Sequence, residues 1–169
     1  MKGTNGLPGP VEEYRESYDS EAEVAAYGND LIADGVRELI GELDASGVSV
    51  GLVTSASCWR TGQVVKLLDL ASLVSAAVCS DDDVRHKPDP APYLAAVTKL
   101  GVEPAACLVI EDSSRGVQSA LAAGVPVLTF VGFGEDREAV AQGLGAITDF
   151  AAESPASLET LHRLVGCKV

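Results

Sequence analysis

From Gly35 onward, short β-rich runs alternate with segments of helical periodicity, and this alternation limits the fold more than any other feature of the sequence. The β-rich runs lie at residues 48–53, 76–79, 107–110 and 126–131, with a further short segment near 146–147. The helical segments lie at residues 36–46, 63–70, 90–100 and 114–123. Strands separated by helices of this length are joined by right-handed crossovers and lie parallel. The chain is therefore predicted to form an α/β three-layer sandwich around a mostly parallel sheet.

The sequence divides into two regions. Residues 1–34 begin with a Gly- and Pro-rich stretch and continue into a weakly amphipathic helix at about 11–26, whereas residues 35–169 form the predicted α/β core. A last helix is expected at 157–164. The core must be built from Val, Leu, Ile and Ala, because aromatic residues make up only 5% of the chain.

Charge and cysteine usage narrow the function classes. The formal net charge is −13, which disfavours nucleic acid and anionic membranes as partners, and no apolar run is long enough to cross a bilayer. The cysteines Cys58, Cys79, Cys107 and Cys167 form no C-x-x-C pair, so we expect buried, reduced thiols. With no signal segment at the N-terminus, the chain is expected to be cytoplasmic.

Two adjacent carboxylates, Glu111 and Asp112, directly follow the strand at 107–110. Carboxylate oxygens held at the end of a rigid strand suit Mg²⁺, which usually takes one or two protein carboxylates and keeps several waters. The alternative is a solvated acidic turn that caps the next helix. The carboxyl ends of parallel strands form the binding edge of such a sheet, which favours a site here.

Lys87, Thr54 and Ser55 also lie at or beyond strand ends. The ammonium of Lys87, in an H-K-P-D-P segment, could neutralise a phosphate oxygen. The hydroxyl of Thr54 and the backbone N–H groups after it could hold a phosphate at the entrance of a helix. Taken singly, Lys87 is more typical of an ordinary surface lysine, and Thr54 and Ser55 of simple helix capping.

The order of these motifs closely resembles the haloacid dehalogenase-like hydrolase superfamily, in its branch of sugar-phosphate phosphatases and β-phosphoglucomutases. The resemblance rests on a strand ending in Thr54, on K-P-D-P, and on V-I-E-D-S-x-x-G-V-x-x-A-x-x-A-G, and it runs from about Gly35 to the C-terminus. It implies that Thr54 binds the transferred phosphoryl group, with Ser55 a weaker match beside it. It implies that Lys87 offsets charge, and that Asp112 with Glu111 binds Mg²⁺.

One part of the family pattern is absent from residues 1–50. The family's nucleophile is the first Asp of a D-x-D-G-T motif on the first strand, and the aspartates Asp19, Asp30, Asp34 and Asp44 lack an apolar strand before them. The resemblance places that strand in the middle of the sheet, between the strands at 48–53 and 107–110. The N-terminal segment could fill the gap, the two neighbours could pair directly, or a second chain could insert a strand. The family's cap is matched by at most its last piece, in residues 11–34.

Three functions follow from this combination. The first is a Mg²⁺-dependent phosphomonoester phosphatase that acts on a small phosphorylated metabolite, with impaired activity as an isolated chain. The second is a non-catalytic module that binds metal, phosphate or a partner chain. The third is a split enzyme, in which another copy or a partner chain completes the sheet. A phosphorelay receiver is set aside because its lysine follows the last strand, and a dinucleotide-binding fold because G-x-G-x-x-G is absent.

Overall fold

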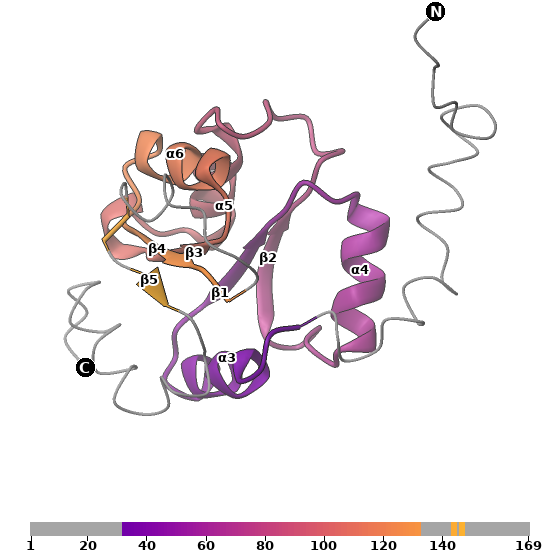
Figure 1. The fold of residues 1–169 in the computed structure, drawn as a ribbon. Helices are drawn as coiled ribbons and strands as arrows, with labels where there is room; N and C mark the ends of the chain where they lie inside the picture. The colour runs from indigo at the N-terminus through magenta and orange to yellow at the C-terminus, as the bar shows by residue number, and fades with distance from the viewer. Residues whose placement is uncertain (1–31, 133–142, 145, 148–169) are drawn as a thin grey trace, which may run out of the picture.

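The computed structural model describes residues 32–132, 143–144 and 146–147. Within them helices and strands alternate as the sequence predicts (Figure 1). In chain order the elements are α3 (Val36–Ala45), β1 (Val50–Val53), α4 (Cys58–Leu67), β2 (Val74–Val78), α5 (Ala91–Leu100), the 3₁₀ turn η2 (Pro104–Ala106), β3 (Val109–Glu111), α6 (Ser114–Ala122), β4 (Val127–Phe130) and β5 (Ala146–Ile147). The predicted helices at residues 11–26 and 157–164 lie outside the described residues.

Local capping chemistry sets the element boundaries, including those that the sequence pattern placed wrongly. The helix expected at 63–70 begins earlier, at Cys58, because the side chain of Ser57 accepts a hydrogen bond from the N–H of Arg60 and so caps the first turn. Helix α5 ends where predicted, at Gly101, whose φ of 69° is the left-handed conformation that glycine adopts without strain. Strand β3 starts at Val109 rather than at 107, because the preceding 3₁₀ turn runs up to Cys107.

The strands form two separate parallel sheets in the described part of the chain. Strand β1 pairs with β2, and β3, β4 and β5 pair in that order. The parallel pairings confirm the α/β class. Direct pairing of β1 with β3, one of the three predicted ways to close the sheet, does not occur. The prediction that the N-terminal segment fills this gap lies outside the described residues.

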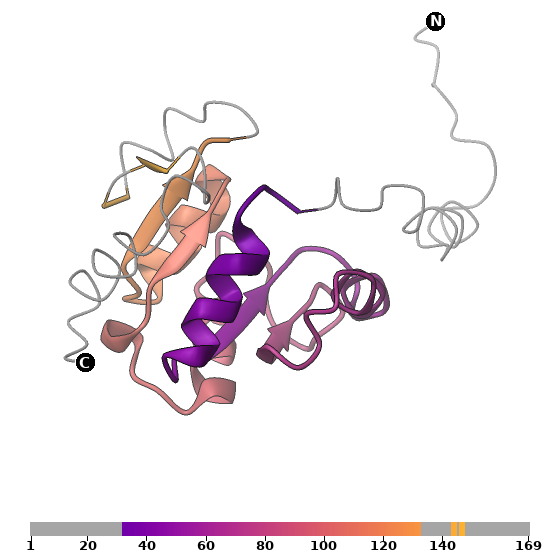
Figure 2. The same cartoon turned by 90° about the horizontal axis from the view of Figure 1, so that it is seen from below.

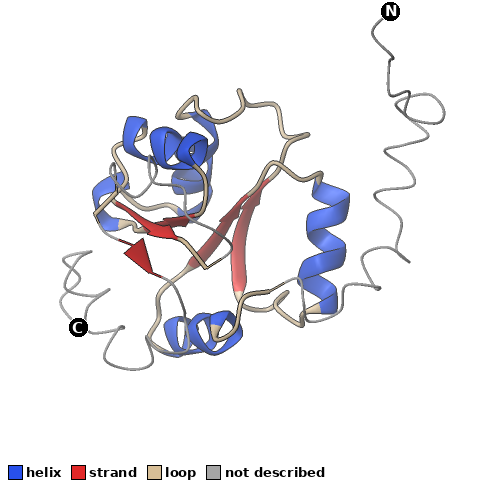
Figure 3. Cartoon of the chain, viewed as in Figure 1, coloured by secondary structure: helices blue, strands red, loops and turns tan. Residues whose placement is uncertain are grey.

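Helices pack on the strands as separate layers, coloured blue around the red strands in Figure 3. Helix α5 packs on β1 and β2, α6 packs on β3 and β4, and the two helices contact each other, so together they hold the two sheets side by side. This shared core consists of Tyr93, Val97, Val117, Ala120, Ala123, Val125 and Val127. A second core joins α3 and α4 around Ile40, Leu68 and Leu70. All of these residues except Tyr93 are aliphatic, as the composition predicts.

The gap between β1 and β3 is covered on one face by α3, which lies between the two sheets when the molecule is seen from below (Figure 2). The start of this helix lines a cavity of about 490 Å³ together with residues from the ends of β1, β3 and β4. The cavity therefore lies at the carboxyl edge of the strands, where parallel sheets bind their ligands.

The cysteines depart in part from the sequence prediction. Cys79 is buried as expected, whereas Cys58 is exposed and Cys107 is half-buried, and all three are free thiols. Hydrogen bonding to Cys79, desolvation and the nearby Asp81 raise the pKa of Cys58 to about 12. The Cys58 thiol is therefore protonated at neutral pH when no metal ion is bound. Within the described residues, no helix combines the length and the apolar character needed to cross a bilayer.

Candidate functional site

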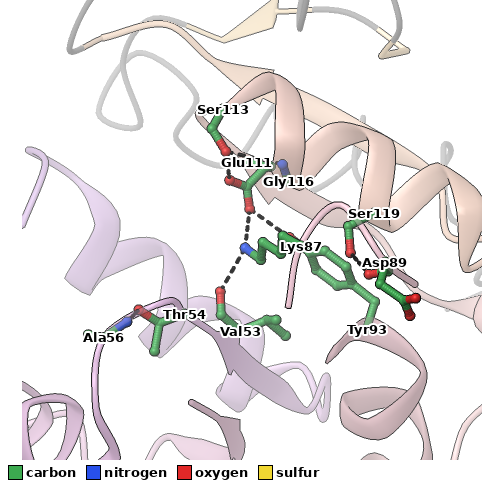
Figure 4. Close-up of polar contacts among 10 residues, drawn as sticks. All are labelled: Val53, Thr54, Ala56, Lys87, Asp89, Tyr93, Glu111, Ser113, Gly116 and Ser119. Carbon is green, nitrogen blue, oxygen red and sulfur yellow. Dashed lines mark hydrogen bonds and ion pairs between the residues drawn. The ribbon is translucent and has the colours of Figure 1, made fainter. Parts of the chain in front are cut away.

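All five residues that the sequence singles out line the same cavity. Thr54 and Ser55 follow β1, Lys87 comes from the loop after β2, and Glu111 and Asp112 lie at the end of β3. Figure 4 shows how the side chains of Lys87 and Glu111 meet across the space between the two sheets, close to the end of β1. The structure thus brings together residues from three segments that are far apart in the sequence.

The ammonium of Lys87 spans the gap between the ends of β1 and β3. Its Nζ lies 2.8 Å from Oε2 of Glu111 and donates to the carbonyl oxygen of Val53 at 3.1 Å. The N–H of Thr54 donates to Val78 on β2, so the carbonyl in the same trans peptide unit, that of Val53, points the opposite way, toward the gap. Lys87 therefore donates to a carbonyl on the edge of β1 that would face the neighbouring strand in a continuous sheet.

Glu111 is buried and accepts hydrogen bonds on both carboxylate oxygens. Its Oε2 accepts from Lys87 and, at 2.6 Å, from the hydroxyl of Tyr93, while Oε1 accepts from Ser113 at 2.8 Å. Burial alone would raise the pKa of the Glu111 carboxyl, but the charge of Lys87 and these hydrogen bonds outweigh it and hold the pKa below its usual value. Glu111 is thus a charged carboxylate within the protein that holds Lys87 in place.

Gly116, in the first turn of α6, makes room for the Glu111 side chain. A Cβ atom at this position would collide with the carboxylate of Glu111. The N–H of Gly116 donates to the hydroxyl of Ser113, which itself donates to Glu111. The glycine of the V-I-E-D-S-x-x-G segment therefore has a direct steric reason, because a larger residue would push Glu111 away from Lys87.

Asp112 is exposed at the cavity, in contrast to its neighbour Glu111. Partial desolvation and the adjacent charge of Glu111 raise the pKa of the Asp112 carboxyl. A cation bound in the cavity would relieve this repulsion, and a carboxylate oxygen is the donor that Mg²⁺ prefers. The donor chemistry at Asp112 therefore fits a hard divalent metal ion.

The turn after β1 presents Thr54 to the cavity. Its Oγ1 accepts a hydrogen bond from the N–H of Ala56 at 3.1 Å. A hydroxyl that accepts in this way keeps its own hydrogen available for donation to an anion. Ser55, the weaker candidate, is exposed and lines the cavity beside Thr54.

The loop that carries Lys87 is fastened to α6. The carbonyl of Lys87 accepts from the guanidinium of Arg115, and the carbonyl of Asp89 accepts from the hydroxyl of Ser119, which is fully buried. The carboxylate of Asp89 accepts from the N–H of Ala91 at the start of α5, and the Lys87-Pro88 peptide is cis. These contacts fix where the lysine enters the cavity.

Sequence reasoning missed the role of Tyr93. This residue is 4% exposed, its hydroxyl donates to Glu111, and its ring centroid lies 5.0 Å from the Lys87 ammonium. Its position four residues before Val97 on α5 predicts only a core aromatic residue. A useful signal was its place six residues after Lys87, which puts it on the first turn of the helix that the lysine loop enters.

Comparisons with known proteins identify the family. The family model described as haloacid dehalogenase-like hydrolase matches residues 10–130, which is more than half of the chain. The chain therefore belongs to the haloacid dehalogenase-like hydrolase family, as its motifs predict, and members of this family generally use a divalent metal ion.

Within this family the chain is similar to phosphatases. It is 38% identical over 104 residues to the phosphoglycolate phosphatase of Salmonella choleraesuis, covering 62% of this chain and 41% of that protein. It is 38% identical over 116 residues to the phosphoglycolate phosphatase of Rhodospirillum rubrum, covering 69% and 47%. The chain thus spans less than half the length of these relatives.

Solved structures share the fold. CbbY from Rhodobacter sphaeroides in complex with phosphate superposes with a TM-score of 0.78 at 22% identity, covering 94% of this chain and 73% of that one. A putative β-phosphoglucomutase from Thermotoga maritima gives a TM-score of 0.75 at 24% identity, covering 92% and 72%. These likenesses confirm the predicted Rossmann-like α/β architecture.

Proposed function

We propose that this chain is the core of a Mg²⁺-dependent phosphatase that acts on a small phosphorylated metabolite. The observation that carries the proposal is the shared cavity, in which the hydroxyl of Thr54, the ammonium of Lys87 and the carboxylate of Asp112 lie at the ends of parallel strands. The similarity to phosphoglycolate phosphatases supports a phosphomonoester as the substrate.

Each of these residues has a distinct task in the proposed site. Thr54 donates its hydroxyl hydrogen to a phosphoryl oxygen, with the exposed Ser55 beside it. Lys87, held by Glu111, places a positive charge where charge develops on the phosphoryl group during transfer. Asp112 holds the metal ion, and Glu111, whose oxygens already accept three hydrogen bonds, contributes to the metal site through its charge. The bound Mg²⁺ would supply charge neutralisation on the phosphoryl oxygens.

The nucleophile in this proposal comes from a strand that fills the gap between β1 and β3. A carboxylate oxygen of an aspartate would attack phosphorus as the alkoxide leaves, and water would then hydrolyse the aspartyl-phosphate. Residues 1–50 contain no D-x-D-G-T motif, so the chain by itself would provide the electrostatic half of the site. We therefore expect slow turnover, since preorganised donors alone give only residual catalysis.

The test of this proposal is an assay of the purified chain with p-nitrophenyl phosphate and Mg²⁺, alone and after addition of a synthetic strand peptide that carries D-x-D-G-T. Slow turnover that rises with the peptide and is lost in Asp112→Asn supports the proposal. Fast turnover without peptide that is lost in Asp112→Asn, yet survives substitution of every aspartate in residues 1–50, would show that the account of the nucleophile is wrong.

A second candidate function is a non-catalytic module that binds metal, phosphate or a partner chain. The facing edges of β1 and β3, which pair with no strand among the described residues, favour it, because open edges recruit further strands. This module would bind Mg²⁺ at Asp112 without turnover in any combination of peptide and metal. Calorimetric titration with Mg²⁺ together with the assay above separates the two functions.

The division of the chain into two regions and its cellular location belong to the same proposal. Residues 35–169 would form the catalytic core and residues 1–34 a separate N-terminal segment that includes the last piece of a cap. The free thiols of Cys58, Cys79 and Cys107 are in keeping with the reducing cytoplasm, where we place the chain.

A further inference from the structure

Two cysteines that lie far apart in the sequence meet at the carboxyl ends of β1 and β2, outside the cavity described above. Cys58 is the first residue of α4, and Cys79 directly follows β2. The Sγ atoms of both cysteines and a carboxylate oxygen of Asp81 all lie within 4.8 Å of one another. None of the three residues lines that cavity.

The backbone around this cluster is fixed by hydrogen bonds to its own acidic residues. The N–H of Cys58 donates to Oδ1 of Asp81 at 2.6 Å, and the N–H of Cys79 donates to Oδ2 of Asp82 at 2.7 Å. Between these loops, the N–H of Ser80 donates to the carbonyl of Ala56 at 2.9 Å. The two thiols are therefore presented by a defined scaffold.

Asp82 lies beside the cluster and contacts both Cys58 and Lys99. Its Oδ2 lies 3.9 Å from Sγ of Cys58, and its Oδ1 lies 3.5 Å from Nζ of Lys99. Lys99 in turn donates to the carbonyl of Ala77 at 2.7 Å, which ties Asp82 to β2. Residues that orient metal ligands in this way contribute to metal affinity.

We propose that Cys58, Cys79 and Asp81 form a second metal site, which takes a thiophilic divalent cation of the Zn²⁺ class. Two thiolate ligands and one carboxylate match the donors that Zn²⁺ accepts, with water in the fourth position, whereas Mg²⁺ is bound by oxygen ligands. The site differs in its donor atoms from the Mg²⁺ site proposed at Asp112. A cation there would connect the loop after β2 to the start of α4, four residues after Thr54, and so would stiffen the turn that presents Thr54.

The experiment uses Co²⁺ as a spectroscopic probe for this class of cation. The full chain, reduced and freed of metal by a chelator, is titrated with Co²⁺ under anaerobic conditions. Sulfur-to-cobalt charge-transfer absorption in the near ultraviolet should grow and saturate at one equivalent, and Zn²⁺ should then displace the cobalt. The bands should be absent from Cys58→Ser and Cys79→Ser and strongly weakened in Asp81→Asn. Asp82→Asn should weaken binding by about tenfold, as expected for loss of a group that orients the ligands.

Two variants serve as matched controls. Cys107→Ser removes a half-buried thiol elsewhere in the fold, and Asp112→Asn removes the proposed Mg²⁺ ligand. Both should keep the cobalt bands, so failure of the phosphatase proposal and failure of this one are distinguishable. The proposal is overturned if no sulfur-to-cobalt band appears, or if the band persists in Cys58→Ser and Cys79→Ser. It is also overturned if the reduced chain binds no cobalt while mild oxidation consumes the Cys58 and Cys79 thiols together, which would identify a redox pair.

Discussion

The ammonium of Lys87 lies 2.8 Å from the carboxylate of Glu111, and the two side chains are only 11% and 9% exposed. This ion pair connects the loop after β2 to the end of β3, across a gap that no strand fills among the described residues. Tyr93 and Ser113 complete the hydrogen bonds of the carboxylate. The position of the lysine in the cavity therefore depends on residues that need not touch a substrate.

Loss of Lys87 should leave a buried carboxylate without its counter-ion. We expect Lys87→Met to lower the free energy of unfolding by about 3 kcal/mol, because breaking one partner of a buried pair leaves the other charge uncompensated. The double variant Lys87→Met with Glu111→Gln should recover part of the loss. Urea unfolding of the wild type, Lys87→Met and the double variant measures these changes.

As a control, Arg85→Met breaks an ion pair with Asp89 in which the arginine is 82% exposed, and should cost less than about 1 kcal/mol. Equal losses for Lys87→Met and Arg85→Met would contradict the account.

Substitution of Gly116 tests the space around Glu111. A Cβ atom at this position meets the Glu111 carboxylate, so we expect Gly116→Ala to displace Glu111 and to destabilise the fold by about 2 kcal/mol. Gly62, inside α4, has no atom within 4 Å of an added Cβ, and Gly62→Ala should be neutral or stabilising by up to about 1 kcal/mol. Thermal unfolding compares the two. A Gly116→Ala protein as stable as Gly62→Ala would show that the carboxylate lies elsewhere.

The hydroxyl of Tyr93 should influence the pH at which the protein unfolds in acid. The pKa of Glu111 is lower in the folded chain than in the unfolded one, so its contribution to stability is complete above the unfolded value of about 4.3 and disappears as the pH falls through the folded value. Tyr93→Phe removes one donor to Glu111 and brings the pKa of Glu111 in the folded chain closer to its value in the unfolded chain. We expect a loss of about 1 kcal/mol at neutral pH and acid unfolding that begins at a higher pH.

The measurement for Tyr93→Phe is urea unfolding in metal-free buffer as the pH is lowered from neutral. An acid limb that does not move relative to that of the wild type would show that the Tyr93 hydroxyl does not hold the charged form of Glu111.

Removal of the Asp112 charge should stabilise the metal-free protein. Its folded pKa is raised, so the ionised form costs stability above that pKa, and the cost disappears as the pH falls through it. Asp112→Asn removes the cost at neutral pH. The gain should stay below about 1 kcal/mol because the side chain is exposed. Thermal unfolding in chelator checks the gain, and added Mg²⁺ should raise the midpoint of the wild type only. Asp112→Asn that is stabilised by Mg²⁺ as strongly as the wild type would rule out Asp112 as the ligand.

Much of the fold could be predicted from the sequence, because its signals are local. The apolar spacing of Leu39 and Ile40 marks α3, Gly101 marks the end of α5, and Ser113 caps α6. The grouping of the five predicted residues around one cavity could be foreseen because parallel strands bring their carboxyl ends to one edge. Their order along the chain then pointed to the family that the comparisons confirm.

The features that escaped prediction depend on contacts between distant residues. Tyr93 and Val97 share an apolar helix face, so the periodicity of α5 does not distinguish a tyrosine whose hydroxyl binds Glu111 from an ordinary core aromatic residue. Cys58 begins α4 and Cys79 follows β2, and the parallel pairing of β1 with β2 brings these distant segments together. The direct pairing of β1 with β3 that we considered does not occur, and sequence pattern offers no rule for which edges meet.

The central claim is that Thr54 and Asp112 belong to one site that binds phosphate together with Mg²⁺. Calorimetric titration of inorganic phosphate into the full chain, with and without Mg²⁺, tests it most directly. We predict that phosphate binds more tightly when Mg²⁺ is present, that Asp112→Asn abolishes this enhancement, and that Thr54→Val weakens phosphate binding by about tenfold, as expected for loss of a hydrogen bond to a charged group. Phosphate affinity that is independent of Mg²⁺ and unchanged in both variants would contradict the account.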